Sequence, residues 1–484
     1  MNVLNDLKDS CGVFAIYSFS KNPVSIRIYN GLTSIQHRGQ DSAGMSVFSS
    51  DKILTKKSAG LVSDVFGEKD INRLKGHIGI GHVRYPTTGH SVEEDAQPFV
   101  INHPMKGIAL AHNGNIANLT YVNKLIRRRG RSVSSSCDAE FILHCIADEL
   151  VRSKGNIWTA VKNTMKILDG SYVVVMMTGE GQLVAFRDPL GIKPLCMGRD
   201  KDRIVFASES TALDINNMAL TRDVRPGEAI IVSKRGVRSR VLLKRAKHAH
   251  CMFEYVYFSR PDSILDKRSV YNVRFRLGQI LAQNDSVKAD VVVPVPDTSR
   301  PAASGYSYQS GIPVAEGLIK NRYVARTFIM PDQTKRSLAV RLKLNALRSI
   351  LYEKRVVLID DSIVRGTTLK PIIGLLKSVG TKEIHVRITC PPITSPCFYG
   401  INIPTYEELS AYKHSVEEIR KEAGCDSLVY MDTKGLLRAI GMPKSKLCIG
   451  CISDKYPTRE GNVLAKKIKT SKGCKDIRCW ETME

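Results

Sequence analysis

The first half of the chain consists of short apolar runs separated by turns rich in Gly, Asn and Asp. Runs of this kind between turn residues predict strands, and they occupy residues 11–17, 45–48, 79–83, 107–111, 172–177 and 183–186. Apolar residues three and four positions apart predict helices, at residues 24–32, 122–128, 139–150 and 156–168. This mixture of elements favours a layered α+β sandwich.

The pattern changes at residue 261. Continuous apolar runs at 291–294, 356–359 and 383–388 predict buried strands, while 269–283 and 368–379 have helical spacing. Strands that alternate with helices predict a parallel sheet. We therefore expect a doubly wound α/β domain over residues 260–442. Residues 443–484 contain closely spaced cysteines followed by lysines, which predicts an extension that wraps around this domain.

The composition narrows the class of protein. The chain has 484 residues, of which 43% are hydrophobic and 25% charged, so we expect more than one core and no disordered or fibrous chain. No apolar run approaches the roughly 18 residues of a membrane-spanning helix, and residues 1–10 lack a signal-peptide core. We therefore expect a cytoplasmic protein that does not enter a membrane. The net charge of +25 favours anionic partners without identifying them.

The most informative stretch is residues 356–368, which read Val-Val-Leu-Ile-Asp-Asp-Ser-Ile-Val-Arg-Gly-Thr-Thr. Asp360 and Asp361 follow a buried strand at its carboxyl end, where open α/β sheets place their ligands. Arg365 begins a turn that opens a helix, and the free N–H groups there suit a phosphate. Because two carboxylates would repel a phosphate, they are better explained as ligands of sugar hydroxyls and of a hard cation such as Mg²⁺.

This stretch resembles the phosphoribosyl pyrophosphate (PRPP) motif of the type I phosphoribosyltransferases. The resemblance implies that Asp360 and Asp361 bind the ribose hydroxyls and belong to the Mg²⁺ site. The same resemblance implies that the following loop binds PRPP through Ser362, Arg365, Gly366, Thr367 and Thr368. Residues 293–299 resemble the pyrophosphate loop of that family, with Thr298 as a Mg²⁺ ligand, although Pro-Asp-Thr-Ser is also common in ordinary turns. The Lys- and Arg-rich residues 320–345 would be a mobile lid, with a solvated loop as the alternative.

A second candidate site lies in the first half of the chain. Cys11 begins a predicted strand, where a cysteine by itself is more often a small buried apolar residue than a nucleophile. The segments 37–44, 81–89 and 111–115 are too rich in Gly and polar residues for a core. Together with residues 186–191, these four segments resemble the N-terminal-nucleophile glutaminase domain of the class II glutamine amidotransferases. The resemblance implies an αββα sandwich over residues 11–240.

In that family the catalytic cysteine is the first residue, which implies that residues 1–10 are a propeptide. Its removal would free the α-amino group of Cys11, whose pKa of roughly 7.7 to 8.0 allows it to act as the general base for its own thiol. The resemblance implies an oxyanion hole made by Asn113 and the Gly114 N–H. It also implies that Arg84 and Asp138 bind the α-carboxylate and the α-ammonium group of glutamine. Taken singly, Asn113-Gly114 could be a tight turn and Asp138 a helix N-cap.

A chain with both domains resembles the glutamine PRPP amidotransferase family. The resemblance implies conversion of glutamine and PRPP into 5-phosphoribosylamine, glutamate and pyrophosphate, the first committed step of purine synthesis. It also implies a homotetramer that purine nucleotides inhibit. One alternative is a class II amidotransferase with another acceptor, which the PRPP motif disfavours. The other is a PRPP-sensing protein that binds nucleic acid, but such a protein would not need a glutaminase domain, so we expect no nucleic-acid partner.

Twelve cysteines without an export signal predict reduced thiols, metal ligands or catalysis rather than disulfides. Cys448-Ile449-Gly450-Cys451 is a CxxC sequence, typical of a ligand pair for zinc or an iron–sulfur cluster, or of a redox pair. Resemblance to the iron–sulfur subgroup of the family adds Cys251 and Cys397 and implies a structural [4Fe–4S] cluster. Zinc is the alternative, because four thiolates suit either. Cys474 and Cys479 match no ligand position.

Overall fold

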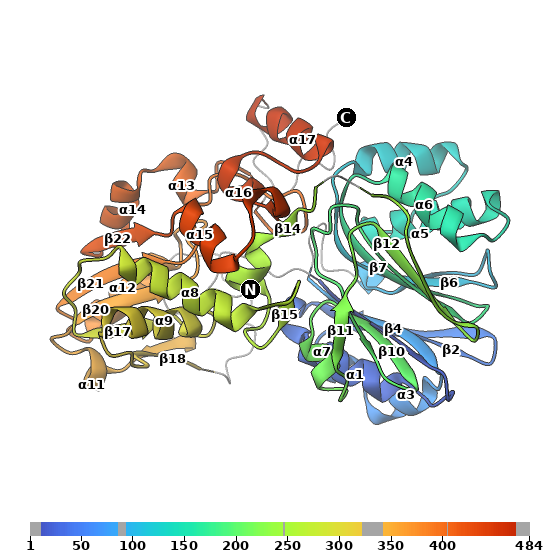
Figure 1. Cartoon of the computed structure of the whole chain (residues 1–484), viewed down its shortest axis with the longest axis horizontal. Coiled ribbons are helices and arrows are strands. Elements are labelled where there is room, and N and C mark those ends of the chain that lie inside the picture. The colour runs from blue at the N-terminus through green and yellow to red at the C-terminus, as the bar shows by residue number, and fades with distance from the viewer. Residues whose placement is uncertain (1–10, 86–92, 245–246, 322–341, 404, 471–484) are drawn as a thin grey trace.

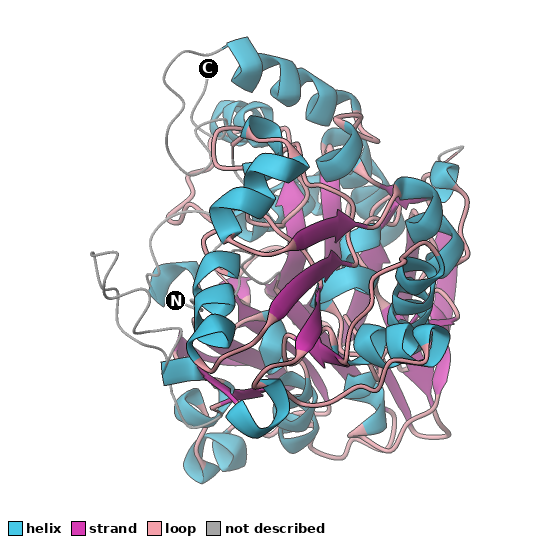
Figure 2. Cartoon of the chain, turned by 90° about the vertical axis from the view of Figure 1, so that its left-hand side faces the viewer, coloured by secondary structure: helices cyan, strands magenta, loops and turns pink. Residues whose placement is uncertain are grey.

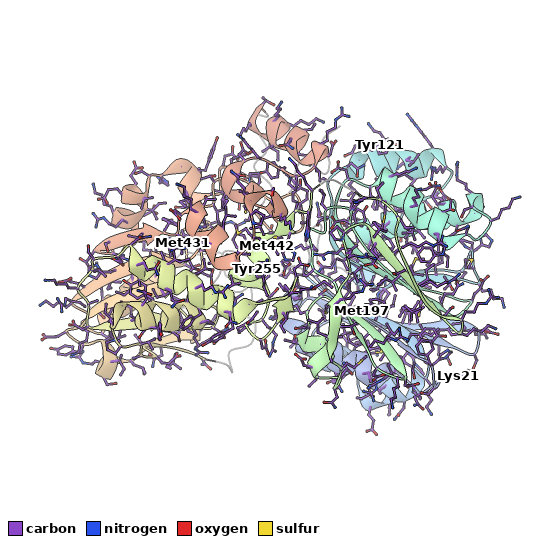
Figure 3. All side chains as sticks on the ribbon, viewed as in Figure 1. Lys21, Tyr121, Met197, Tyr255, Met431 and Met442 are labelled. Atoms are coloured by element: carbon purple, nitrogen blue, oxygen red, sulfur yellow. The ribbon has the colours of Figure 1, made fainter. Side chains whose placement is uncertain are left out.

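The computed structural model describes residues 11–85, 93–244, 247–321, 342–403 and 405–470. The chain forms two lobes that meet in the middle of the molecule, with the first half on the right of Figure 1 and the second half on the left. Tyr255 and Met442, both buried, lie where the lobes meet (Figure 3). None of the described helices is long and apolar enough to cross a membrane.

The first lobe contains two antiparallel sheets that pack face to face. In spatial order, the seven-stranded sheet comprises β11 (Leu220–Asp223), β9 (Cys196–Arg199), β10 (Arg203–Ala207), β1 (Gly12–Ser18), β4 (Ile78–Arg84), β2 (Ser42–Ser49) and β3 (Lys52–Ala59). The six-stranded sheet comprises β13 (Gly236–Val241), β12 (Glu228–Ser233), β8 (Gln182–Arg187), β7 (Gly170–Thr178), β6 (Ile108–Ile116) and β5 (Phe99–Ile101). Alternate apolar residues from strands of both sheets, such as β1 and β7, form the shared core.

Helices cover both outer faces of this sandwich. Helix α1 (Ser25–Ser34) packs on β1 and β4 through Ile28 and Leu32. Helices α5 (Asp138–Arg152) and α6 (Ile157–Ile167) cover the other sheet. The remaining helices of the lobe are α2 (Val62–Val65), α3 (Glu68–Arg73), α4 (Leu119–Arg128) and α7 (Thr211–Asp214), with short turns at Gln36–Arg38 and Glu93–Asp95. The order helix, sheet, sheet, helix confirms the predicted αββα sandwich.

The second lobe contains a four-stranded parallel sheet, as predicted. Its strands, in spatial order, are β17 (Val291–Pro294), β20 (Arg355–Asp360), β21 (Glu383–Ile388) and β22 (Ser427–Tyr430). Figure 2 turns this lobe toward the viewer and shows helices around the strands. These helices are α8 (Val270–Gln283), α9 (Arg300–Ser310), α11 (Arg348–Leu351), α12 (Leu369–Ser378), α13 (Ser410–Lys413), α14 (Val416–Ala423) and α15 (Thr433–Ile440).

Smaller elements complete the second lobe. They are the two-stranded pairs β15 (Ile264–Leu265) with β16 (Arg268–Ser269) and β18 (Leu318–Lys320) with β19 (Leu344–Ala346), the turn η3 (Glu254–Phe258) and a short turn at Lys444–Lys446. In the tail, β23 (Leu447–Cys448) pairs in parallel with β14 (His250–Cys251), ahead of α16 (Gly450–Ser453) and α17 (Arg459–Thr470). Because Leu464 and Ile468 of α17 share the core of the second lobe, the described part of the tail is an extension of that lobe.

Two interpretations of the polar segments were wrong. Segment 37–44 was expected to be too polar and glycine-rich for a core, yet β2 begins at Ser42 and Ser42, Ala43 and Gly44 are buried. The reason is close packing: a Cβ on Gly44 would lie 2.1 Å from the Gln97 carbonyl oxygen. The second wrong interpretation concerns segment 111–115. The predicted strand 107–111 continues to Ile116, so this polar segment lies inside β6 and is buried.

Candidate active sites and cysteine cluster

Cys11 immediately precedes β1 and is buried. Its thiol donates a hydrogen bond to the Tyr85 carbonyl oxygen at 3.5 Å, and its own carbonyl accepts one from Arg38 Nε at 3.1 Å. Burial raises the pKa of the Cys11 thiol, and the nearby Arg84 and Lys193 only partly oppose that effect. The thiol is therefore held neutral, and a base must remove its proton before it can act as a nucleophile.

Arg84 and Asp138 both lie close enough to Cys11 to influence its thiol electrostatically, Arg84 lowering its pKa and Asp138 raising it. Arg84 ends β4, which pairs with β1, and its Nη2 lies 3.0 Å from Asp95 Oδ2 in a buried ion pair. Asp138 Oδ2 accepts a hydrogen bond from the Ile116 N–H at 3.2 Å. The structure thus brings a cation and an anion to the thiol, a pattern complementary to the two charged groups of a free amino acid.

Asp138 does not occupy the N-cap position of α5. It is the first helical residue, and the N-cap is Cys137. Its Oδ1 lies 3.3 Å from Nδ1 of the buried His112 on β6. The N-cap interpretation of this carboxylate is therefore wrong, and its contacts fix it against the strand that carries Asn113.

Asn113 and Gly114 lie inside β6 rather than in a turn. Asn113 Nδ2 donates to Ser208 Oγ at 3.4 Å, and the same oxygen accepts a hydrogen bond from the Val13 N–H at 3.0 Å. The buried Oδ1 of Asn113 has no hydrogen-bond partner within the described part of the chain. Gly114 has φ +150°, and a Cβ there would lie 2.1 Å from the Ser171 carbonyl oxygen. The turn interpretation is wrong, and only glycine fits at position 114.

Sequence reasoning missed a buried ion network behind Cys11. Arg38 contacts Glu209 at 2.6 Å and Glu254 at 2.9 Å, and Glu254 also lies 3.3 Å from Lys193 Nζ. Burial alone would raise the pKa of Glu254, but Arg38 and Lys193 outweigh it and hold that pKa low. Arg38 lies in the polar segment 37–44, so its position was visible in the sequence, whereas its partners come from distant segments.

The second site lies at the carboxyl edge of the parallel sheet. Asp360 is the last residue of β20, and Asp361 follows it. Asp361 Oδ2 accepts a hydrogen bond from Thr298 Oγ1 at 2.6 Å, and its Oδ1 accepts one from Ser362 Oγ at 2.6 Å. Burial raises the pKa of Asp361, although Arg274 opposes the shift. The structure therefore joins Asp361, predicted from the end of β20, to Thr298, predicted from the loop after β17.

The predicted phosphate loop connects β20 to α12. Gly366 has φ +72°, in the left-handed region that favours glycine, and Thr368 is the N-cap residue of α12. The buried Oγ1 of Thr368 has no hydrogen-bond partner among the described residues, and Arg365 Nε donates to Glu408 at 2.6 Å. The loop thus places an unpaired hydroxyl at a helix N-terminus, a position suited to an anion.

The four predicted cluster cysteines gather where the tail meets the second lobe. Cys251 and Cys448 face each other across the β14–β23 pair, and Cys451 lies one residue into α16. The Cys397 N–H donates to the Ile403 carbonyl at 2.9 Å, while the Cys451 carbonyl accepts from the Thr394 and Ser395 N–H groups at 3.0 Å. All four are buried and free of disulfides.

The pKa values of these thiols also indicate that they lie close together, because the pKa of each of Cys251, Cys448 and Cys451 is raised by another thiol of the group. Burial raises the pKa of Cys251 to about 12, and it also raises the pKa of Cys448 and of Cys451 well above the ordinary thiol value. Cys397 adds to the rise in each case, and Cys251 adds to it at both Cys448 and Cys451. Thiols in this environment become thiolates only with a compensating positive charge, which a metal centre supplies.

Several predicted features lie outside the described residues. They are the propeptide at 1–10, residues 86–89 of the polar segment 81–89, the central part of the predicted lid at 322–341, and the part of the tail at 471–484 that contains Cys474 and Cys479. The two ends of the predicted lid are described, and they pair as β18 and β19 with Lys320 opposite Leu344.

Comparisons with known proteins agree with both lobes. The glutamine amidotransferase domain family matches residues 82–215, and the phosphoribosyl transferase domain family matches residues 262–396. The fold and these two sites define a two-domain enzyme that joins a glutaminase to a phosphoribosyltransferase.

Full-length relatives identify the family more closely. An amidophosphoribosyltransferase of Methanothermobacter thermautotrophicus is 47% identical over 94% of this chain and 96% of its own length. That of Bacillus subtilis is 42% identical over 94% of this chain and 95% of its own length. The structure of the B. subtilis glutamine PRPP amidotransferase complexed with ADP and GMP superposes with a TM-score of 0.86, covering 93% of this chain and 98% of that one. This chain belongs to the amidophosphoribosyltransferase family.

Proposed function

We propose that this chain carries out the reaction of its family through the residues described above. It is a glutamine-dependent amidophosphoribosyltransferase of purine biosynthesis, which converts glutamine, PRPP and water into 5-phosphoribosylamine, glutamate and pyrophosphate. The observation that supports this assignment of residues is that one chain contains both sets of candidate residues. In one lobe a buried thiol is influenced by the opposite charges of Arg84 and Asp138, and in the other two adjacent carboxylates precede a phosphate-type loop.

In the first site, Cys11 Sγ attacks the side-chain carboxamide carbon of glutamine. The carbon–nitrogen bond then breaks, the thiol proton passes to the leaving nitrogen, and ammonia departs to leave a thioester. Water hydrolyses the thioester to glutamate and restores the thiol. Because burial holds the Cys11 thiol neutral, the step needs a base, and the free α-amino group left by removal of residues 1–10 supplies it.

Asn113 and Gly114 stabilise the oxyanion that forms during this attack. Ser208 links the Asn113 amide to the backbone of Val13, two residues from the nucleophile, so β1 and β6 are held in fixed relation. A donor fixed in this way needs no reorganisation as charge develops, and one such donor typically contributes about 2.7 to 4 kcal/mol. Arg84 and Asp138 hold the α-carboxylate and the α-ammonium group, which selects free glutamine over a peptide.

In the second site, the nitrogen lone pair of ammonia attacks C1 of PRPP. The bond from C1 to the pyrophosphate oxygen breaks, pyrophosphate leaves with the electron pair, and the new amine loses a proton. The phosphate loop holds the 5-phosphate through Arg365, Gly366, Thr367 and Thr368. Asp360 and Asp361 hold the ribose hydroxyls.

Mg²⁺ fits the donor set of this second site. Asp361 is buried with its pKa raised by burial, and Thr298 contacts it at 2.6 Å, so a hard divalent cation would restore the charged carboxylate. Asp360, Asp361 and Thr298 would hold the ion and its water shell. When bound, Mg²⁺ neutralises charge on the pyrophosphate group.

The four cysteines fit an iron–sulfur cluster better than zinc. In a tetrahedral zinc site with Zn–S distances near 2.3 Å, the sulfurs lie about 3.8 Å apart. In the described part of the chain, no three of the four cysteine sulfurs lie within 4.8 Å of one another. The one group of three potential ligand atoms that is this compact contains no cysteine. The wider spacing of Cys251, Cys397, Cys448 and Cys451 favours a [4Fe–4S] cluster. Neither half-reaction transfers electrons, so the role of the cluster is structural.

The contacts around Cys397 explain what such a cluster would organise. Asn115 Nδ2 donates to the Phe398 carbonyl at 3.1 Å, and Ser171 Oγ donates to the Tyr399 carbonyl at 2.9 Å. These bonds join the strands of the glutaminase sheet to the residues that follow Cys397. The cluster would therefore hold the second lobe against the strand that carries the oxyanion hole.

Regulation and assembly complete the proposal. The B. subtilis relative was solved in complex with ADP and GMP, and another similar structure, with a TM-score of 0.86, is described as the allosteric regulatory enzyme of purine biosynthesis. We infer that purine nucleotides inhibit this chain and that it works as a homotetramer. Size-exclusion chromatography with light scattering, and inhibition assays with purine nucleotides, test these two points.

The direct test of the proposal combines N-terminal sequencing with an activity assay on the same sample. The expected result is a protein that begins at Cys11 and releases pyrophosphate only when glutamine and PRPP are both present. A fully active chain that still begins at Met1 would refute the assigned role of the Cys11 amine.

A further inference from the structure

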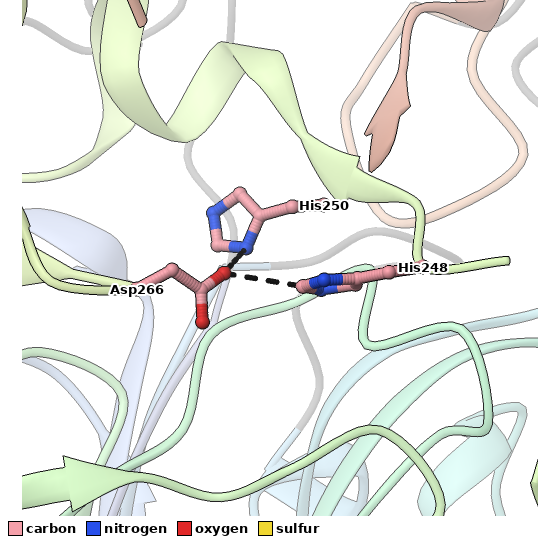
Figure 4. Close-up of side chains that lie close together, drawn as sticks. All are labelled: His248, His250 and Asp266. Carbon is pink, nitrogen blue, oxygen red and sulfur yellow. Dashed lines mark ion pairs between the residues drawn. The ribbon is translucent and has the colours of Figure 1, made fainter. Parts of the chain in front are cut away.

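Two histidines and an aspartate meet at the junction of the two lobes, and none of them belongs to either proposed catalytic site. His248 and His250 lie in the segment that leaves the glutaminase sandwich, and Asp266 lies in the turn between β15 and β16 of the second lobe. Figure 4 shows both imidazoles turned toward the same carboxylate oxygen. No proposed step of the reaction uses any of the three.

The ligand atoms of these side chains all lie within 4.8 Å of one another. His250 Nδ1 is 2.5 Å from Asp266 Oδ2, and His248 Nε2 is 3.8 Å from the same oxygen. Nε2 of His248 is buried and has no hydrogen-bond partner within the described residues, although it points at a carboxylate. Two ligand atoms of a tetrahedral zinc ion lie about 3.4 Å apart, which is close to the distance between His248 and the carboxylate. The shorter His250–Asp266 contact is a direct ion pair, and it would open by about 1 Å when an ion binds.

The surrounding chain holds this group in place. Gly191 leaves the space that the His248 ring occupies, because a Cβ there would lie 3.0 Å from His248 Nε2. The Ala249 N–H donates to the Leu190 carbonyl and the Cys251 N–H to the Ile192 carbonyl, at 2.8 and 3.0 Å. The segment of the two histidines is therefore fixed to the first lobe on both sides of His250.

Charge and accessibility are compatible with a divalent ion. Arg187 lies nearby, with Nη2 3.3 Å from His250 Nδ1 and Nη1 3.7 Å from Asp266 Oδ1. Its guanidinium also donates to the carbonyls of Lys193, Val224 and Gly191 at 2.7 to 2.9 Å, so it leaves Asp266 Oδ2 to the two histidines. Asp223 interacts electrostatically with Asp266, so two carboxylates offset the added positive charge. The side chains of His248 and Asp266 are 23% and 16% exposed, which leaves a path for an ion to enter.

We propose that His248, His250 and Asp266 form a divalent metal site of the zinc type, with water in the remaining coordination position. Two imidazole nitrogens and one carboxylate are the donors of open zinc sites, and the same set binds Co²⁺ and Ni²⁺. Because the ligands come from the linker and from the second lobe, the ion would tie the two lobes together. His250 directly precedes Cys251 in β14, but none of the three proposed ligands is one of the four cysteines, so the site does not require the proposed cluster.

The test is a titration of the full-length protein with Co²⁺ alone, under anaerobic conditions, followed by visible absorption. The expected result is one Co²⁺ per chain with ligand-field bands of nitrogen and oxygen ligation. Binding at the cysteines would be recognised separately by intense thiolate-to-cobalt charge transfer. His248→Gln and Asp266→Asn should each weaken Co²⁺ binding at least about tenfold, the lower end of the loss seen for outer-shell partners of metal ligands. The exposed His414 provides the matched control, and His414→Gln should bind as the unchanged protein does.

A second measurement needs no variant. X-ray absorption at the zinc edge of the Zn²⁺-loaded, unchanged protein should show nitrogen and oxygen neighbours for the ion at this site. Three results would each overturn the proposal. They are binding of Co²⁺ at the cysteines alone, an affinity of His248→Gln for Co²⁺ equal to that of the unchanged protein, and ligation of the bound zinc by sulfur alone.

Discussion

At the residue scale, the glutaminase site depends on a position where only glycine fits. Gly114 has φ +150°, and a Cβ placed on it would lie 2.1 Å from the Ser171 carbonyl oxygen, which is too close for any side chain. Its neighbour Asn113 is fixed by Ser208. Function at this site therefore rests on backbone conformation as much as on the nucleophile.

Gly114→Ala should abolish glutamine use while leaving ammonia use intact. The added Cβ must displace β6 or β7, which moves the oxyanion donors, and loss of one such donor lowers kcat roughly 100- to 1,000-fold. Glutamine hydrolysis is measured beside ammonia-dependent formation of phosphoribosylamine. Gly130→Ala is the matched control, because Gly130 also has positive φ but nothing within 4 Å of its virtual Cβ. Equal loss in both variants would show that general strain, not the oxyanion hole, is responsible.

A second residue-scale prediction concerns Glu140, which orders the loop before Asp138. Its carboxylate accepts hydrogen bonds from the Ser134 and Ser135 N–H groups at 2.9 and 2.7 Å. Burial alone would raise the pKa of Glu140, but His144 and the serines outweigh it and lower the pKa from 4.5 to about 2. A depressed carboxyl pKa gives stability that is present above the unfolded value and is lost as the pH falls toward the folded value.

Glu140→Gln should therefore lower the urea midpoint at about pH 7, and this difference from the unchanged protein should shrink as the pH approaches about 4 and below. Urea unfolding at both pH values measures it. Glu68, exposed in the first turn of α3, provides the control Glu68→Gln. A difference that does not depend on pH would contradict the assigned pKa.

At the element scale, the sequence predicted the architecture well because each lobe has a regular pattern. The strands at 291–294 and 383–388 were predicted to the residue. The residues proposed as ligands, Thr298 and Asp361, follow the ends of the parallel strands β17 and β20 and contact each other. Strand β22 was missed because its exposed and buried residues do not form a continuous apolar run. The extension of β6 to Ile116 was missed because its polar side chains are buried by partners from other segments, such as Ser208 for Asn113.

The same limit explains which site residues could be predicted. Cys11, Asp360 and Asp361 stand in local motifs that carry their chemistry. The partners Glu209, Glu254 and Lys193 have no local signal, because a buried ion network is defined only when distant segments meet.

The loop after Cys397 is the element that joins the lobes most closely at the active site. Gly400 has φ +97°, and a Cβ there would lie 3.1 Å from the Gly114 carbonyl carbon. Gly400→Ala should push the second lobe away from β6, so that glutamine hydrolysis and ammonia-dependent synthesis both persist while glutamine-dependent synthesis falls. The ratio of phosphoribosylamine formed to glutamine hydrolysed measures this coupling. Gly424→Ala is the control, because Gly424 also has positive φ, +76°, at the C-cap of α14, and its virtual Cβ meets only Lys377 Nζ at 3.5 Å, so the ratio should stay unchanged.

At the scale of the whole molecule, the four cysteines gather where the tail meets the second lobe, and the Cys251 N–H also bonds to the Ile192 carbonyl of the first lobe. Cys448→Ser should remove the cluster, abolish its visible absorbance and lower the melting temperature, because the binding free energy of a structural metal centre is part of the folding free energy. Iron and zinc content with thermal unfolding measure the effect. Cys425→Ser removes a buried cysteine outside the group and should leave the iron content unchanged. Zinc in place of iron in the anaerobically purified protein would contradict the proposed cluster.

The central claim is that two separate sites in one chain divide the reaction between them. The most direct measurement compares Cys11→Ala and Asp361→Asn in three assays: glutamine hydrolysis, glutamine-dependent synthesis and ammonia-dependent synthesis of phosphoribosylamine. Cys11→Ala should lose both glutamine reactions and keep ammonia-dependent synthesis, whereas Asp361→Asn should keep basal glutamine hydrolysis and lose both syntheses. Glutamine-dependent synthesis that survives Cys11→Ala, or ammonia-dependent synthesis that survives Asp361→Asn, would contradict the account.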